Sequence, residues 1–138
     1  MKRVLLDCDV VLDVLLKRQP FVLTSAQVLD AVVTTKIEGY LAGHAVTNIY
    51  YILRRQLGRE TAYQELSKLL QHLRIVSITD AVIRAALQSA MSDLEDAVAS
   101  EAAKAAGLDL IVTRNLTAFV ASSVPALLPN DLLKMLSE

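Results

Sequence analysis

Carboxylates occur in this chain where a buried strand or a helix start would bring them together. Asp7 ends the short apolar run Val4–Leu6, a pattern typical of a buried strand that delivers a charge to the edge of a parallel sheet. Ligand sites in open α/β sheets lie just beyond the carboxyl ends of the strands. Carboxylates gathered there repel one another unless a cation joins them, and oxygen ligands suit Mg²⁺ or Mn²⁺. The pattern therefore predicts a divalent metal site that includes Asp7.

A second group of acids stands at the start of a predicted helix. Asp93, Glu95 and Asp96 lie close together, and helix capping explains two of them, through either Ser92 with Glu95 or Asp93 with Asp96. Acids also suit the positive end of the helix dipole. Small residues follow on one face of this helix: Ala97, Ala99, Ala102 and Ala103. Because this face lets the helix pack closely, we expect Asp96 near the sheet edge as a catalytic metal ligand, with Asp93 assisting it.

Two further acids follow Asp7. Asp9 and Asp13 are four residues apart and so share a helix face. Asp9 is the closer to the predicted site and is a candidate metal ligand. Helix capping near Val10 is the alternative role for Asp7, and Asp9 fits that cap equally well. Asp13 is expected to be a solvated surface acid.

A polar group follows the second apolar run, 110–113. Asn115 is a candidate catalytic residue that positions water or phosphate, and its alternative role is that of a turn residue. Thr113 is a candidate hydrogen-bond donor to an acid or a bound water. Arg114 is either a phosphate-binding group or an ordinary surface arginine.

Other kinds of site lack support in the sequence. His44 and His72 are far apart without metal-ligand spacing, so each is expected to be a cap or surface residue. Cys8 is expected inside the first strand as a buried core thiol. The chain has neither a Gly-rich phosphate loop nor a sequence pattern for a Ser-His-Asp triad.

Size and composition indicate one domain over residues 1–138, with 54% hydrophobic residues. The apolar runs are too short to span a bilayer, and a charge comes too early for a signal peptide, so a cytoplasmic protein without membrane contact is expected. A single cysteine excludes an internal disulfide.

The net charge of −1 gives no global basic field. The best local phosphate-binding strip is Arg54, Arg55 and Arg59.

Short apolar runs alternate with longer amphipathic stretches, which predicts βα units. The expected fold is a three-layer α/β/α sandwich around a central, mainly parallel sheet. Strands are expected over residues 4–8, 40–42, 75–78, 110–113 and 126–128. Helices are expected over residues 10–17, 25–35, 46–57, 60–73, about 80–91, 94–106 and from 129 onward.

With these motifs the chain resembles the PIN-domain family of small endoribonucleases and toxin ribonucleases, over nearly its whole length. The segment 4–13 resembles the first motif of the family, with Asp7 as the first catalytic acid. The segment 93–97 resembles the later acidic motif, with Asp96 as its central acid. The segment 111–119 resembles the last motif. Together the three motifs are fairly specific.

The chain departs from the family pattern at three positions. Asp9 stands where the family usually has asparagine, Asn48 where many members have glutamate, and Ala118 where aspartate is usual. Two of the four usual acids are therefore missing, which predicts weaker Mg²⁺ binding. Asp9, Asp93 and Glu95 are candidates to compensate in part.

The resemblance implies a Mg²⁺- or Mn²⁺-dependent endoribonuclease that hydrolyses RNA phosphodiester bonds, as the toxin of a toxin–antitoxin pair. It implies an RNA substrate, single-stranded or structured, an antitoxin protein and a second copy of the chain as partners. The alternative is a catalytically degenerate PIN module that binds RNA or a protein without cleavage, which Asn48 and Ala118 favour. The sequence does not separate RNA from DNA as the substrate.

A dimer has one physical indication in the sequence. Tyr50, Tyr51 and Leu53 lie beside Arg54 and Arg55, and Tyr and Arg are enriched at protein interfaces. The alternative is that these residues pack in the core of the monomer.

Overall fold

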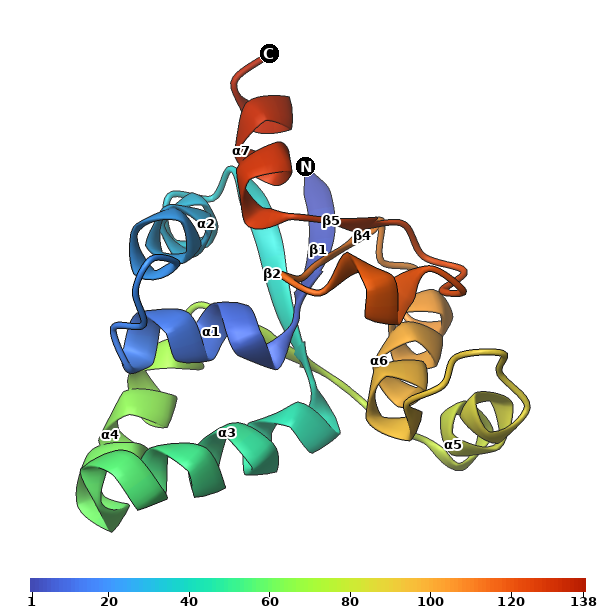
Figure 1. The fold of residues 1–138 in the computed structure, drawn as a ribbon, viewed down its shortest axis with the longest axis horizontal. Helices are drawn as coiled ribbons and strands as arrows, with labels where there is room; N and C mark the ends of the chain where they lie inside the picture. The colour runs from blue at the N-terminus through green and yellow to red at the C-terminus, as the bar shows by residue number, and fades with distance from the viewer.

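The computed structural model describes residues 1–138, and its centre is a five-stranded parallel sheet in the order β3-β2-β1-β4-β5 (Figure 1). The strands are β1 (Lys2–Leu6), β2 (Ile37–Ala42), β3 (Arg74–Val76), β4 (Leu110–Val112) and β5 (Ala126–Leu127). The helices are α1 (Cys8–Leu15), α2 (Val22–Val33), α3 (Gly43–Leu57), α4 (Arg59–Leu69), α5 (Asp80–Leu87), α6 (Leu94–Ala105), the 3₁₀ helix η1 (Leu116–Phe119) and α7 (Pro129–Leu136).

Helices cover both faces of the sheet, which confirms the predicted three-layer fold. Successive side chains of a strand point to opposite faces, so in β1 Val4 and Leu6 pack into one core cluster and Leu5 into the other. The first cluster includes residues from α1 to α4 and α7, and the second includes residues from α5 and α6, on the other side of the sheet in Figure 1. Burial on both faces explains why β1 reads as a continuous apolar run.

The first strand has the predicted length but lies two residues earlier in the chain. It ends at Leu6, because Asp7 caps α1 and its side chain accepts a hydrogen bond from the N–H of Cys8. The prediction that Cys8 lies inside the strand was therefore wrong, and Cys8 is the first residue of the helix. Capping by Asp7 was the alternative role considered for this residue, and the structure shows that it acts as the cap.

Most helix ends agree with the sequence signals. Gly58, with φ at 87°, ends α3, and Pro129 opens α7 as predicted. Thr79 caps α5 by accepting from the N–H of Val82. The helix α5 ends at Leu87 rather than near residue 91, and the hydroxyl of Ser89 then accepts from the N–H of Met91 in the loop that follows. No helix is both long and apolar enough to cross a bilayer.

Candidate functional site

Strand pairing places the first acid beside the end of the neighbouring strand. β1 and β4 are parallel partners, with Leu6 in register with Val112, so both strands end at the same edge of the sheet. The N–H of Asp7 donates to the carbonyl of Val112 at 2.9 Å. The hydroxyl of Thr113 donates to Oδ2 of Asp7 at 2.7 Å, and the N–H of Cys8 donates to Oδ1 at 2.9 Å. Each carboxylate oxygen therefore keeps further lone pairs for a ligand.

The structure brings Asp7 and Asp96 to one cavity. Both line a small cavity of about 30 Å³ that α3, α6 and the end of β1 enclose. A space of this size accommodates a water molecule or a single ion. His44, Cys8 and Glu95 also line it. Carboxylates that are 89 positions apart in the sequence thus meet at the predicted edge of the sheet.

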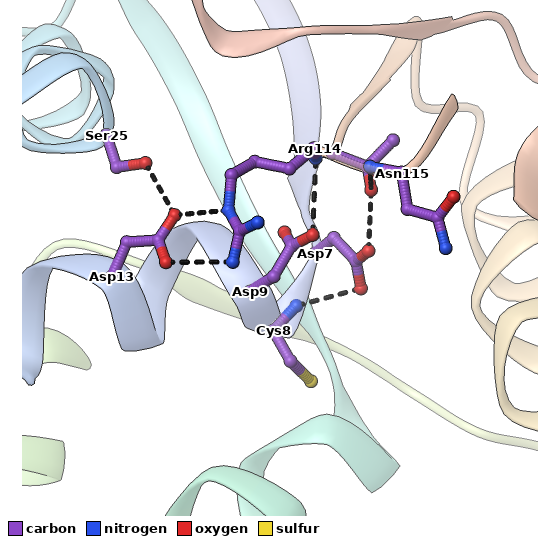
Figure 2. A network of polar contacts seen from close by, with 8 residues as sticks. Asp7, Cys8, Asp9, Asp13, Ser25, Arg114 and Asn115 are labelled. Carbon is purple, nitrogen blue, oxygen red and sulfur yellow. Dashed lines mark hydrogen bonds and ion pairs between the residues drawn. The ribbon is translucent and has the colours of Figure 1, made fainter. Parts of the chain in front are cut away.

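Asp93 and Asn115, the other predicted site residues, act as helix caps. Asp93 is exposed and accepts from the N–H of Asp96 at 3.0 Å, which caps α6. Oδ1 of Asn115 accepts from the N–H of Ala118 at 3.4 Å and so caps η1. Figure 2 shows the Asn115 amide directed away from Asp7. Both residues flank the cavity from loops without lining it.

Asp9 has one partner and one open oxygen. Its Oδ2 accepts from the backbone N–H of Arg114 at 3.2 Å, as Figure 2 shows, whereas Oδ1 is buried without a hydrogen-bond partner. A buried acceptor without a partner is costly, so this oxygen is suited to a proton, a water or a cation. Asp9 therefore remains a candidate ligand at the edge of the site.

The acids raise one another's pKa values. Burial raises the pKa of Asp7, with a further small contribution from the charge of Asp93, and this outweighs the hydrogen bonds from Thr113 and Cys8. Burial, followed by the charges of Asp7 and Asp93, raises the pKa of Asp96 to about 7. Burial and the charge of Asp7 raise the pKa of Asp9 to about 6. Raised pKa values in all three acids indicate that this cluster of carboxylates has too little positive charge nearby to balance it.

A buried ion pair supports the loop that holds Asp7. Asp13 is completely buried and accepts from Nε and Nη2 of Arg114 at 2.7 and 3.0 Å and from the hydroxyl of Ser25 at 3.2 Å (Figure 2). The prediction that Asp13 is a solvated surface acid was therefore wrong. Arg114 is equally not an ordinary surface arginine, because its guanidinium also lies over the ring of Phe21, 3.8 Å from the centroid.

Residues 3–117 match the sequence model of the PIN domain. The chain belongs to the PIN-domain family. Solved structures with the same fold include FitAcB from Neisseria gonorrhoeae, which is 20% identical with a TM-score of 0.72 and covers 91% of this chain and 97% of that chain. A toxin–antitoxin complex from Klebsiella pneumoniae is 17% identical, with a TM-score of 0.68 and the same two coverages of 91% and 97%.

A third structure of similar fold is a toxin of Mycobacterium tuberculosis described as cleaving the sarcin–ricin loop. It is 12% identical, with a TM-score of 0.63, and covers 78% of this chain and 86% of that chain. No curated protein matches this PIN domain in sequence.

The donor set of this PIN domain fits a hard divalent cation. Carboxylate oxygens are the ligands that Mg²⁺ and Mn²⁺ prefer, and Asp7 and Asp96 offer them in one cavity of suitable size. The open Oδ1 of Asp9 is a further oxygen donor. The structure has no group of three or more His, Cys, Asp or Glu side chains already arranged to hold a metal ion. Water and phosphate oxygens would complete the coordination, as is usual for Mg²⁺.

Two residues of the PIN-domain cavity were not expected there from the sequence. His44 lies in the first turn of α3, and its Nε2 is 3.0 Å from the carbonyl of Glu95. The thiol of Cys8 accepts from Nδ2 of Asn48 at 3.7 Å, and burial raises the pKa of Cys8 to about 11. The signal for His44 was its position directly after β2, at the same sheet edge as Asp7.

In the metal-free protein, the free energy of unfolding is expected to fall as the pH rises from about 4 to about 7. The raised pKa of Asp96 means that the folded state binds more protons than the unfolded state in this window. The protonated Asp96 carboxyl stabilises the fold fully when the pH is below its pKa in the unfolded state. This stabilisation is lost as the pH rises through its pKa in the folded state. Asp96→Asn should flatten this dependence. Melting temperatures measured across this range in chelator provide the check, and an unchanged slope in the variant would count against the raised pKa.

Proposed function

We propose that this PIN domain is a metal-dependent endoribonuclease and the toxin of a toxin–antitoxin pair. The observation that carries the proposal is the meeting of Asp7 and Asp96 in one cavity at the carboxyl edge of the sheet, with the pKa of both carboxyls raised. Membership of the PIN family supports a nuclease. The similar folds of a toxin–antitoxin complex and a toxin that cleaves the sarcin–ricin loop support the toxin assignment.

In the proposed mechanism, Asp7 and Asp96 would hold Mg²⁺ or Mn²⁺, assisted by Asp9 or Asp93. A bound ion would lower the pKa of a water molecule and neutralise charge on the phosphodiester. Thr113 fixes the orientation of Asp7 through its 2.7 Å hydrogen bond, so the free lone pairs of this carboxylate point in a constant direction. Asn115 follows on the same loop and would position water or phosphate after its Oδ1 releases the N–H of Ala118.

The proposal is tested by titrating Mn²⁺ while recording thermal stability and cleavage of a generic RNA in parallel. An endoribonuclease should melt at a higher temperature as Mn²⁺ binds, and it should cleave RNA over the same concentration range. Binding of RNA without Mn²⁺-dependent cleavage would instead support the degenerate module. The specific observation favouring that second candidate is that Asn48, where many family members have glutamate, directs its amide to the Cys8 thiol.

Restoring the missing acids should strengthen the site. Asn48→Glu with Ala118→Asp adds two carboxylates next to residues that line the cavity, because Asn48 contacts Cys8 and Ala118 precedes Phe119, so the affinity for Mg²⁺ or Mn²⁺ and any nuclease activity should rise. Stability without metal should fall, because like charges in one pocket repel. Calorimetric metal titration and melting with and without chelator report both effects. If the double variant binds metal no better than the parent, these two positions do not face the cation.

We also propose a homodimer, with the exposed aromatic surface of α3 and α4 at its interface. Tyr51 and Tyr63 are 58% and 52% exposed, and the ring of Tyr50 contacts both of their rings. Leu53, which the sequence had grouped with this surface, is completely buried and belongs to the core instead. Light scattering at micromolar concentration should give a mass near twice 15.1 kDa. A clean monomer mass there would reject the dimer.

A further inference from the structure

A second and larger pocket borders the site at Arg114. It has a volume of about 340 Å³ and lies between the start of α2 and the start of α7. Its walls include Phe21, Thr24, Arg114 and Asn130, and we call it the Phe21 pocket. This volume lies within the range of pockets that bind small organic molecules, which begins at about 300 Å³.

The Phe21 pocket presents an aromatic ring beside a charge that is already paired. Phe21 is 38% exposed, and the guanidinium of Arg114 lies over one face of its ring, 3.8 Å from the centroid, so the exposed part of the ring is the aromatic surface that a ligand can reach. The charge of Arg114 is already matched by the buried carboxylate of Asp13. A free phosphate would therefore gain little here, whereas a planar neutral group can stack on the ring.

Polar groups at the rim supply hydrogen bonds to such a planar group. Asp13 accepts from Nε and from one N–H of Nη2 of Arg114, which leaves three of the five guanidinium N–H groups for a ligand, two of them on Nη1. Thr24 adds a hydroxyl, and exposed Asn130 adds an amide with both a donor and an acceptor. Proteins bind unstacked RNA bases by stacking them on an aromatic ring or a guanidinium and by donating or accepting hydrogen bonds at the base edges.

The backbone connects the Phe21 pocket to the acids. Arg114 directly follows Thr113, which donates to Asp7, and consecutive Cα atoms are about 3.8 Å apart. The N–H of Arg114 itself donates to Asp9. Thr113, which orients Asp7, and Arg114, which lines the Phe21 pocket, are therefore neighbours on one loop.

We propose that the Phe21 pocket binds one unstacked nucleobase of the RNA, next to the cleaved bond. This inference rests on the proposed ribonuclease function, because it takes RNA as the ligand. The affinity for RNA would then depend on the base at one position, and the position of this base would contribute to determining which phosphodiester bond is cleaved.

The test measures the affinity of short single-stranded RNAs in which one base at a time is removed. All proteins carry Asp7→Asn, so the RNA stays intact; asparagine is a good helix cap, so α1 should persist. Removing the base that enters the pocket should weaken binding roughly ten-fold, in line with base–aromatic stacking. In Phe21→Ala that position-specific loss should disappear. Phe21→Leu, which keeps apolar bulk without an aromatic face, should behave like Phe21→Ala.

Leu23→Ala is the matched control, because Leu23 lies two residues after Phe21 in the first turn of α2, is 69% exposed and does not line the pocket. This variant should keep the position-specific loss, and melting curves show whether each variant is folded. Two results would reject base binding by the Phe21 pocket: an equal loss of affinity at every RNA position, or the same position-specific loss in folded Phe21→Ala as in the parent. Cleavage by the protein with Asp7 intact would remain separate evidence for the ribonuclease function. A position-specific loss in a protein that cleaves no RNA would support the pocket and reject the nuclease.

Discussion

Asp7→Asn is expected to reduce metal-dependent RNA cleavage at least about 100-fold while the fold survives. Loss of groups that merely support a metal ligand already costs about 10- to 100-fold in activity, and Asp7 is proposed to bind the metal directly. Asparagine can still accept from the N–H of Cys8 through its Oδ1, and its Nδ2 can donate to the hydroxyl of Thr113, which then accepts instead of donating. Because the substitution removes one of several mutually repelling acids, stability in chelator should hold or rise. Cleavage assays in Mg²⁺ or Mn²⁺ and melting curves in chelator measure the two effects.

Asp30→Asn serves as the control for this substitution, because Asp30 is exposed on α2 and does not line the cavity. It should leave both cleavage and stability nearly unchanged. If Asp7→Asn cleaves RNA as well as the parent, Asp7 is not a catalytic ligand.

Arg114→Met is expected to lower the free energy of unfolding by about 3–5 kcal/mol, because it leaves a buried carboxylate without its cation. Asp13 is completely buried, so its charge cannot turn to water. The reverse substitution, Asp13→Leu, should be milder, because the Arg114 side chain is 26% exposed and can reach solvent. Denaturant unfolding measures the loss, which corresponds to a fall in melting temperature of roughly 10 °C or more.

Arg84→Met provides the matched control for Arg114→Met. Arg84 pairs with Asp80 through side chains that are 77% and 79% exposed, and such pairs contribute less than about 1 kcal/mol. If Arg114→Met and Arg84→Met lower the free energy of unfolding by similar amounts, the ion pair of Asp13 with Arg114 does not stabilise the loop that carries Arg114.

The fold was predictable because its signals are local. The apolar run before Asp7 and the capping acids around Asp96 each identify an element from a few neighbouring residues. The helices that connect parallel strands run opposite to them, so the end of a strand and the start of a helix lie at the same edge of the sheet, which places these two acids together. The structure differs most at the ends of elements, as with Cys8, which begins a helix because Asp7 caps it.

The sequence did not reveal contacts between residues that are far apart along the chain. Asp13 and Arg114 are separated by 101 positions, and no local sequence pattern predicts that they form a buried ion pair. The same holds for His44, whose contact with the Glu95 carbonyl spans 51 positions. Leu53 and Tyr51 look equally suited to an interface in sequence, yet only the three-dimensional packing shows that Leu53 is buried and Tyr51 is exposed.

The most direct test of the proposed metal site is anomalous diffraction from crystals soaked in Mn²⁺. The proposal predicts one ion in the small cavity, with an oxygen of Asp7 and an oxygen of Asp96 each at about 2–2.6 Å. Crystals of Asp96→Asn treated in the same way should show a weaker peak. An ion bound elsewhere, or a cavity without Mn²⁺ at concentrations that saturate any cleavage, would contradict the proposed site.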